Sequence, residues 1–151
     1  METTVSWNGA AHDEAGSSMA FVARTDSGHT VAMDGAPASD GDPLGGRNLA
    51  PRPMELVLAG TGGCTAYDVV LILRRGRHVV TQCDVTLKAE RAESDPKVFT
   101  RIHFHFVVVG EGLKHEVVER AIRLSHEKFC SASVMLGKTA ALTHTFEIRE
   151  S

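Results

Sequence analysis

The stretch that decides the fold reads Pro51-Arg-Pro-Met-Glu-Leu-Val-Leu-Ala-Gly-Thr-Gly-Gly-Cys64-Thr-Ala-Tyr-Asp68. It predicts a helix from Pro53 to about Arg75, because proline suits the first helical turn and the apolar run continues well beyond Asp68. Asp68 is the one charged residue between Leu56 and Leu73. We therefore expect this helix to be buried on all sides, which a chain of 151 residues achieves most simply when a second copy covers one side.

Three glycines lie within this predicted helix, at positions 60, 62 and 63. Glycine is a poor helix former, so its presence needs a separate reason. The expected reason is that glycine lets another helix approach closely. The helix is therefore a candidate seam of a homodimer.

Three later segments alternate between apolar and polar residues, as strands with one buried face do. They are Val79–Arg91, residues 98–109 and residues 139–149, and Asp95-Pro96 marks the turn between the first two. These segments predict an antiparallel sheet with one face toward solvent.

The remaining segments complete an α+β chain that we expect to be one domain, residues 1–151. A short strand is predicted at Thr3–Trp7. Residues 19–24 and 29–34 flank a turn and predict a hairpin, and residues 35–52 predict a loop rich in Gly, Pro, Asp and Ser. Helical spacing predicts an amphipathic helix from 113 to about 129 and a shorter helical piece over 131–138.

Composition excludes several classes of function. The net charge of −3 argues against sequence-independent nucleic-acid binding, which needs a basic face. The N-terminus has no basic start or apolar signal core, and no apolar run is expected to reach the ~18–20 residues that span a bilayer. Three cysteines are too few for a secreted disulfide scaffold, so the cytoplasm is the expected location.

Two of the three cysteines are candidates for chemistry. Cys64 lies near the middle of the predicted buried helix, and Cys130 follows the amphipathic helix. A thiol is a useful nucleophile only as the thiolate, so Cys64 would need a nearby arginine or histidine. The alternative is that each is a small buried hydrophobe, as most free cysteines are. Cys83, on the apolar face of a strand, is expected to be such a residue.

The sequence resembles the OsmC/Ohr family at two places. The run quoted above resembles the central helix of that family, with its proline, its Glu-Leu pair and its small residues before the first reactive cysteine. His126-Glu-Lys-Phe-Cys130-Ser-Ala-Ser133 resembles the second cysteine motif. Elsewhere the chain is similar to a less-characterised branch of the family.

The resemblance implies an OsmC-like α+β fold in which two chains intertwine. It implies that Cys64 attacks a hydroperoxide and becomes a sulfenic acid, that Cys130 resolves it to a disulfide, and that a dithiol reductant reopens the bond. It also implies that Glu55 helps to hold an arginine against the Cys64 thiolate. Glu55 also suits the first turn of a helix by its charge, and both roles can hold together.

The arginine itself has several candidates. The family carries it in the early hairpin, where the matching position here is Asp26. Arg24, two residues earlier and on the same strand face, is the preferred candidate, and Arg47 and Arg52 are loop alternatives. The alternative for each of the three is a solvated surface charge, as most arginines are.

Other polar residues near these motifs carry weaker signals. Asp68 lies one turn beyond Cys64, where an ionised carboxylate opposes thiolate formation unless it is paired or protonated. His103 and His105 share a strand face, and His144 lies on another strand. Their spacing does not match a metal motif, so neither a metal nor another cofactor is expected.

Together these observations predict a homodimeric, thiol-dependent reductase of hydroperoxides. Organic peroxides are favoured, because Leu56, Val57 and Phe129 would form an apolar wall that suits an alkyl chain. The alternative is a non-catalytic dimer that binds a small apolar or thiol-bearing ligand in the same cleft. Neither reading involves nucleic acid or a membrane.

Overall fold

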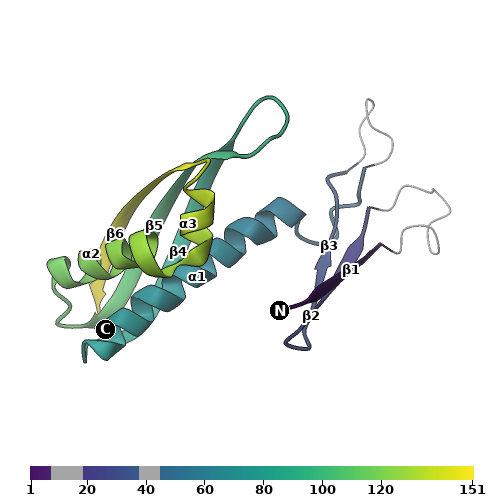
Figure 1. Cartoon of the computed structure of the whole chain (residues 1–151). Helices are drawn as coiled ribbons and strands as arrows, with labels where there is room; N and C mark the ends of the chain where they lie inside the picture. The colour runs from purple at the N-terminus through teal and green to yellow at the C-terminus, as the bar shows by residue number, and fades with distance from the viewer. Residues whose placement is uncertain (8–18, 38–44) are drawn as a thin grey trace. The chain divides into compact units, whose positions relative to one another are not determined.

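The computed structural model describes residues 1–7, 19–37 and 45–151 (Figure 1). The chain divides into two compact units, Met1–Val57 and Leu58–Ser151. The expectation of a single domain over the whole chain stays a prediction.

The first unit contains a three-stranded antiparallel sheet in the order β1-β2-β3. Its strands are β1 (Thr3–Trp7), β2 (Phe21–Thr25) and β3 (Thr30–Met33). The hairpin between β2 and β3 turns at Gly28, whose φ of 83° lies in the left-handed region that favours glycine. The predicted first strand and hairpin are therefore confirmed.

A buried aspartate organises the loop that follows β3. Asp34 is 2 % exposed, and its carboxylate accepts hydrogen bonds from the backbone N–H groups of Gly35, Arg47 and Leu49. The bond from Leu49 is the main cause that lowers the pKa of Asp34, and the charge of Arg47 acts in the same direction. This carboxylate thereby holds the two ends of the loop together. The predicted loop over 35–52 is confirmed where it is described, and residues 38–44 lie outside the described residues.

The second unit contains a second three-stranded sheet in the order β4-β5-β6. Its strands are β4 (Val79–Arg91), β5 (Phe99–Glu111) and β6 (Ala141–Glu150). β4 and β5 are antiparallel as predicted, but β6 runs parallel to β5, so the expectation of an antiparallel sheet is wrong at this strand. The reason is the helical connection between β5 and β6, which crosses over one face of the sheet and returns the chain to its starting end.

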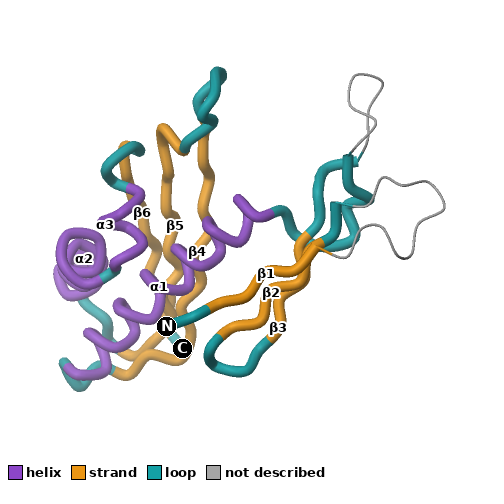
Figure 2. Tube along the Cα trace, turned by 45° about the vertical axis from the view of Figure 1, so that its right-hand side comes forward, coloured by secondary structure: helices purple, strands orange, loops and turns teal. Residues whose placement is uncertain are grey.

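The core of this unit lies between the sheet and the helices on one of its faces (Figures 1 and 2). Alternate side chains of β5 are fully buried on that face, namely Ile102, Phe104, Phe106 and Val108. The opposite face carries His103 and His105, which bond to the hydroxyls of Thr143 and Thr145. The predicted division of the sheet into an apolar and a polar face is confirmed.

α1 (Pro53–Arg75) buries one stripe only within this chain. The stripe contains Thr61, Thr65, Val69 and Leu73, spaced four residues apart. Tyr67, on another face, is 69 % exposed, so this chain alone leaves one face of the helix open, and its burial by a second copy stays a prediction. The physical reason is that its own sheet covers a single side of it.

Gly62 lies against the sheet and not, as expected, against another helix. A Cβ atom at this position would lie 2.6 Å from Cδ1 of Leu87, so the glycine lets α1 approach strand β4 rather than another helix. At Gly60 and Gly63 a Cβ atom would meet nothing within 4 Å. These two positions stay available to the predicted dimer seam.

Among the described residues, α1 is the one helix long and apolar enough to cross a membrane by length and composition. The expectation that no apolar run is long enough to span a bilayer is wrong for this helix. Its leucines, valines and isoleucine keep the mean hydropathy high despite the glycines, the threonines and Asp68. The core helices of globular proteins also reach this length and hydropathy. α1 packs one stripe against the sheet, as such core helices do.

The connection between β5 and β6 is built from three helical pieces. α2 (His115–Leu124) continues into a π-helical turn, η1 (Ser125–Phe129), and α3 (Ser131–Leu136) follows. Cys130 interrupts the helix with φ −75° and ψ 102°, an extended conformation. The predicted helix end near Phe129 and the shorter helix after it are confirmed. The wider π-helical turn, a feature often found at functional sites, was not anticipated.

Candidate active site

Three reactive side chains converge in the second unit. The sulfurs of Cys64 and Cys130 and a carboxylate oxygen of Asp68 all lie within 4.8 Å of one another. Cys64 and Asp68 are four residues apart on α1, which places them on the same side of the helix. Cys130 comes from the break between η1 and α3. The structure therefore brings together the two cysteines that the sequence singled out.

Cys130 is fully buried, and its sulfur accepts hydrogen bonds from Ser133 and Cys64. The backbone N–H of Ser133 lies 3.4 Å from this sulfur, and the hydroxyl of Thr65 lies 3.9 Å from it. Burial by itself would raise the pKa of Cys130, but hydrogen bonds donated by Cys64 and Ser133, with a smaller contribution from the contact with Thr65, lower the pKa. These donors stabilise a thiolate on Cys130.

Cys64 has the opposite electrostatic environment. Burial raises its pKa most, and the hydrogen bond that its thiol donates to Cys130 raises it further. The charge of Asp68 also raises the pKa, as the sequence suggested, while a bond with the backbone of Ala132 lowers it. Within this unit, the pKa of Cys64 is therefore raised and the pKa of Cys130 is lowered. Cys64 is half-buried and so is the more accessible of the two sulfurs.

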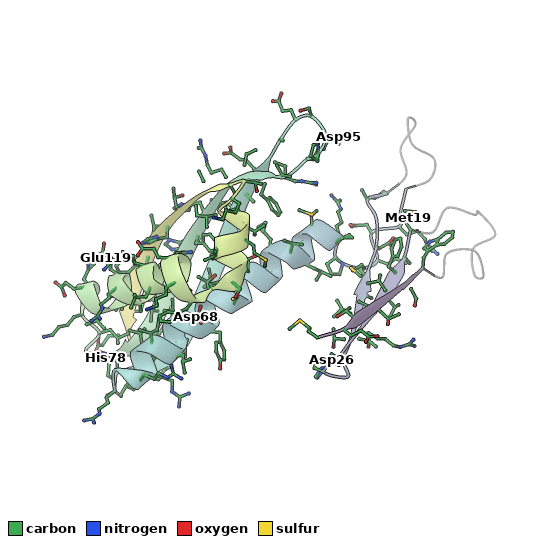
Figure 3. The ribbon with its side chains drawn as sticks, in the orientation of Figure 1. Met19, Asp26, Asp68, His78, Asp95 and Glu119 are labelled. Atoms are coloured by element: carbon green, nitrogen blue, oxygen red, sulfur yellow. The ribbon has the colours of Figure 1, made fainter. Side chains whose placement is uncertain are left out.

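Ser125 fixes the carboxylate of Asp68. Its hydroxyl lies 3.1 Å from Oδ2 of Asp68 and 3.5 Å from the backbone oxygen of Thr65. Ser125 is fully buried and opens the π-helical turn, and its carbonyl accepts the N–H of Cys130. Figure 3 shows Asp68 on the side of α1 that faces this helical segment. One serine thus joins the carboxylate and the Cys130 loop.

A buried histidine lies behind Cys130. Nδ1 of His126 is 3.3 Å from the hydroxyl of Ser133, which in turn bonds to Cys130. The ring of His126 packs edge-on against Phe104, with 4.6 Å between the ring centroids, and stacks with His144. Burial, followed by the charge of His144, lowers the pKa of His126 to about 4. His126 is therefore neutral near pH 7, and its Nδ1–H donates to Ser133 when Ser133 donates to Cys130.

Sequence reasoning missed four members of this site, Thr65, Ser125, His126 and Ser133. His126 and Ser133 both lie inside the second cysteine motif, and Thr65 follows Cys64 directly. Their positions beside the cysteines could have identified them from the sequence. Nothing in the sequence indicates Ser125, because its place in the site depends on the π-helical turn.

Glu55 and the candidate arginines lie in the first unit. Oε2 of Glu55 accepts the backbone N–H of Arg52 at 2.9 Å, which caps the start of α1. Arg24 is exposed on β2, in a hollow that it shares with Glu2 and Asp26. Arg47 is tied to Asp34 through its backbone. No ion pair joins Glu55 to an arginine among the described residues of Met1–Val57, and the expected role of an arginine at Cys64 stays a prediction.

Cys83 lies apart from this chemistry on β4, where it is half-buried. Burial, with a smaller contribution from the charge of Asp84, raises the pKa of Cys83 to about 11. It is therefore protonated near pH 7 and a poor nucleophile. His144 pairs with Phe104, so it faces the helices while His103 and His105 face away from them.

Replacing Ser133 with alanine should raise the lower of the two pKa values of the cysteine pair. Ser133→Ala removes the hydroxyl bond to Cys130 and keeps the backbone N–H that also supports the thiolate. Thiolate ultraviolet absorbance, titrated in a Cys83→Ser background, measures this pKa. Ser131→Ala, at an exposed neighbouring serine, is the matched control. An unchanged pKa in Ser133→Ala, or an equal rise in the control, would contradict the assignment.

The buried histidine predicts a dependence of stability on pH. The pKa of His126 is about 4 in the folded protein, against about 6.5 for an ordinary histidine. Between these values the unfolded chain binds a proton that the folded chain does not. The free energy of unfolding should therefore fall as the pH decreases from about 6.5 to about 4. Urea denaturation at several pH values should show this slope, and His126→Leu should reduce it. A slope that is the same in His126→Leu would rule out this histidine as a cause.

Comparisons with known proteins agree with this geometry. The model of the OsmC family, described as OsmC-like protein, matches residues 45–145. Protein YhfA of Escherichia coli K12 is 45 % identical over 130 residues, which cover 86 % of this chain and 90 % of YhfA. A hypothetical protein from Aquifex aeolicus superposes with a TM-score of 0.78 at 26 % identity, covering 99 % of this chain and 96 % of the other.

The organic hydroperoxide resistance protein OsmC of Legionella pneumophila shares the fold at 16 % identity, with a TM-score of 0.64 and coverage of 97 % and 95 %. The fold expected from the resemblance is thereby confirmed as OsmC-like. The family match covers both cysteines and most of the second unit. This chain belongs to the OsmC-like protein family.

Proposed function

We propose that this protein reduces organic hydroperoxides and uses Cys64 and Cys130 as a redox pair. The observation that carries the proposal is the convergence of the two sulfurs within 4.8 Å, with a network that stabilises a thiolate on one of them. The family supports a peroxide-related role, since one structural relative is described as an organic hydroperoxide resistance protein. Phe129, next to Cys130 and 50 % exposed, offers an apolar contact for an alkyl group.

In the proposed reaction Cys64 attacks first, because its sulfur is the more accessible one. The thiolate-biased Cys130 accepts the Cys64 proton through their hydrogen bond. The Cys64 thiolate then attacks the peroxide, the O–O bond breaks, and a sulfenic acid and an alkoxide form. The alkoxide takes up a proton and leaves as the alcohol.

Cys130 completes the oxidative half of the cycle. Its sulfur attacks the sulfenic acid on Cys64, a disulfide forms, and water leaves. Overall, two thiols and one hydroperoxide give a disulfide, an alcohol and water. A dithiol reductant then reduces the disulfide and restores both thiols. The hydrogen bonds that Ser133 donates to Cys130 favour its thiolate for this step.

Three further parts of the proposal rest on the sequence. An arginine among Arg24, Arg47 and Arg52 is proposed to lower the pKa of Cys64 in the assembled protein. A dithiol, either a small molecule or a protein, is proposed as the reductant that reopens the disulfide. The cytoplasm, where thiols are kept reduced, is the proposed location.

Replacing each of the two cysteines should block the reaction with hydroperoxide at a different step. Cys130→Ser should stop at a sulfenic acid on Cys64, which then oxidises further, because no resolving thiol is present. Cys64→Ser should consume almost no cumene hydroperoxide. Peroxide consumption and trapping of the sulfenic acid, followed by mass spectrometry, measure both outcomes.

Cys83→Ser is the matched control for these variants. It should keep the wild-type rate, because the pKa of Cys83 is raised to about 11 and its thiol is protonated. Rapid peroxide consumption by Cys64→Ser, with a sulfenic acid on Cys130, would reverse the proposed roles. Loss of activity in Cys83→Ser with the fold intact would contradict the assignment of the pair.

The observation that favours the alternative is the raised pKa of Cys64. Its leading causes include no basic side chain, so the thiol is a weak nucleophile unless a cation reaches it. A non-catalytic dimer that binds a small apolar or thiol-bearing ligand would show this property. Free thiols that persist after cumene hydroperoxide is added to the reduced protein would favour this alternative.

We also propose that the protein is an intertwined homodimer. The support is the face of α1 that this chain leaves open, which carries Ala66, Tyr67, Val70 and Leu71, with Arg74 at its end. A second copy is the proposed cover, because an exposed apolar helix face of this kind is typical of an interface. Gly60 and Gly63 would allow close approach there.

Sedimentation equilibrium tests the oligomeric state directly. The wild-type protein should sediment as a dimer at micromolar concentration. Val70→Glu, on the open face, should shift the equilibrium toward the monomer by placing a charge in the seam. Thr100→Glu, at an exposed position of β5, is the control. A monomeric wild-type protein would overturn the proposal.

A further inference from the structure

We propose that Cys64, Asp68 and Cys130 form a binding site for a thiophilic divalent cation, Zn²⁺ above all, in the reduced protein. Their three donor atoms lie within 4.8 Å of one another. The inference concerns the atoms of the proposed redox pair, but it does not require that they reduce peroxides.

The spacing of the donors suits a metal ion. With Zn–S bonds of about 2.3 Å and Zn–O bonds of about 2.0–2.2 Å, tetrahedral ligands lie about 3.5–3.8 Å apart. The observed limit of 4.8 Å leaves only small side-chain rotations between the present arrangement and that geometry. Cys64 and Asp68, four residues apart on one helix, form a rigid half of the site, and Cys130 closes it from the opposite segment.

The donor types select the class of cation. Two thiolates favour Zn²⁺ and other soft or borderline ions over Mg²⁺ or Ca²⁺, which prefer oxygen ligands. The single carboxylate supplies a third, harder ligand. Three protein ligands leave a fourth position for water, the arrangement of zinc sites that remain open to exchange.

The groups behind the donors hold them in place. The hydroxyl of Ser125 lies 3.1 Å from Oδ2 of Asp68, and the N–H of Ser133 lies 3.4 Å from the sulfur of Cys130. Hydrogen-bonded ligands of this kind are typical of metal sites, where outer partners orient the donors. Ser125 belongs to the π-helical turn, so the backbone itself fixes the partner of the carboxylate.

The charges of the three groups give the reason for a cation. Two thiolates and one carboxylate would place three negative charges within 4.8 Å. A divalent ion compensates this repulsion and displaces the protons of the thiols.

Metal titration of the reduced full-length protein tests the inference without any peroxide. Co²⁺ is the spectroscopic probe, since its bonds to thiolate give charge-transfer absorption in the near ultraviolet, and Zn²⁺ should displace it. We expect one ion per chain. Cys64→Ser and Cys130→Ser should each lose most of the charge-transfer band, and Asp68→Asn should weaken Zn²⁺ binding at least about tenfold.

Two controls make the test specific to this site. Cys83→Ser should bind Zn²⁺ as the wild type does, and so should His103→Ala, which removes a histidine from the opposite face of the sheet. Asp68→Asn keeps the shape of the side chain, and circular dichroism checks that it folds. Absence of a thiolate band in the wild type, or equal Zn²⁺ affinity in Asp68→Asn, would overturn the inference. Either result would leave the proposed peroxide chemistry intact, because that chemistry is measured separately.

Discussion

The hydrogen bonding of the buried Cys130 sulfur is the interaction on which the rest of the site depends. A sulfur with no exposed surface would ordinarily stay protonated. Here the chain leaves the helical conformation at Cys130, so the N–H of Ser133 points at the sulfur instead of joining a helix ladder. The π-helical turn directly precedes this break and begins at Ser125, whose hydroxyl donates to the carboxylate of Asp68. One local departure from α-helical geometry therefore assembles the thiol, the serine and the carboxylate.

The packing of α1 on its sheet supplies the other half of the site. The stripe from Thr61 to Leu73 faces the core, and Gly62 allows the helix to approach Leu87 on β4. Cys64 lies beside this stripe, which explains why it is half-buried and why its sulfur reaches Cys130. Thr65 lies between α1 and the Cys130 segment. Its hydroxyl donates a hydrogen bond to the carbonyl of Thr61 and lies 3.9 Å from the Cys130 sulfur. The redox pair thus depends on the contact between a rigid helix and an irregular segment.

Much of this arrangement could be predicted from the sequence, because its signals are local. Alternation along β4 and β5, the turn at Gly28 and the helix from Pro53 all follow from short-range patterns, and the two cysteine motifs identified the family. The parallel pairing of β6 could not be predicted, since the direction of a strand depends on where a helical crossover ends. The preference for charge on Cys130 was missed for a similar reason. It arises from Ser133, Thr65 and Cys64 meeting in space, and the sequence interpretation had given the thiolate to Cys64 alone.

The central claim is that Cys64 and Cys130 act as one redox pair. The most direct test treats the reduced protein with one equivalent of cumene hydroperoxide and maps its peptides by mass spectrometry under non-reducing conditions. The account predicts a single linkage between the peptides that contain Cys64 and Cys130, which a dithiol reverses. A linkage between Cys64 and Cys83, or no linkage while peroxide is consumed, would contradict it.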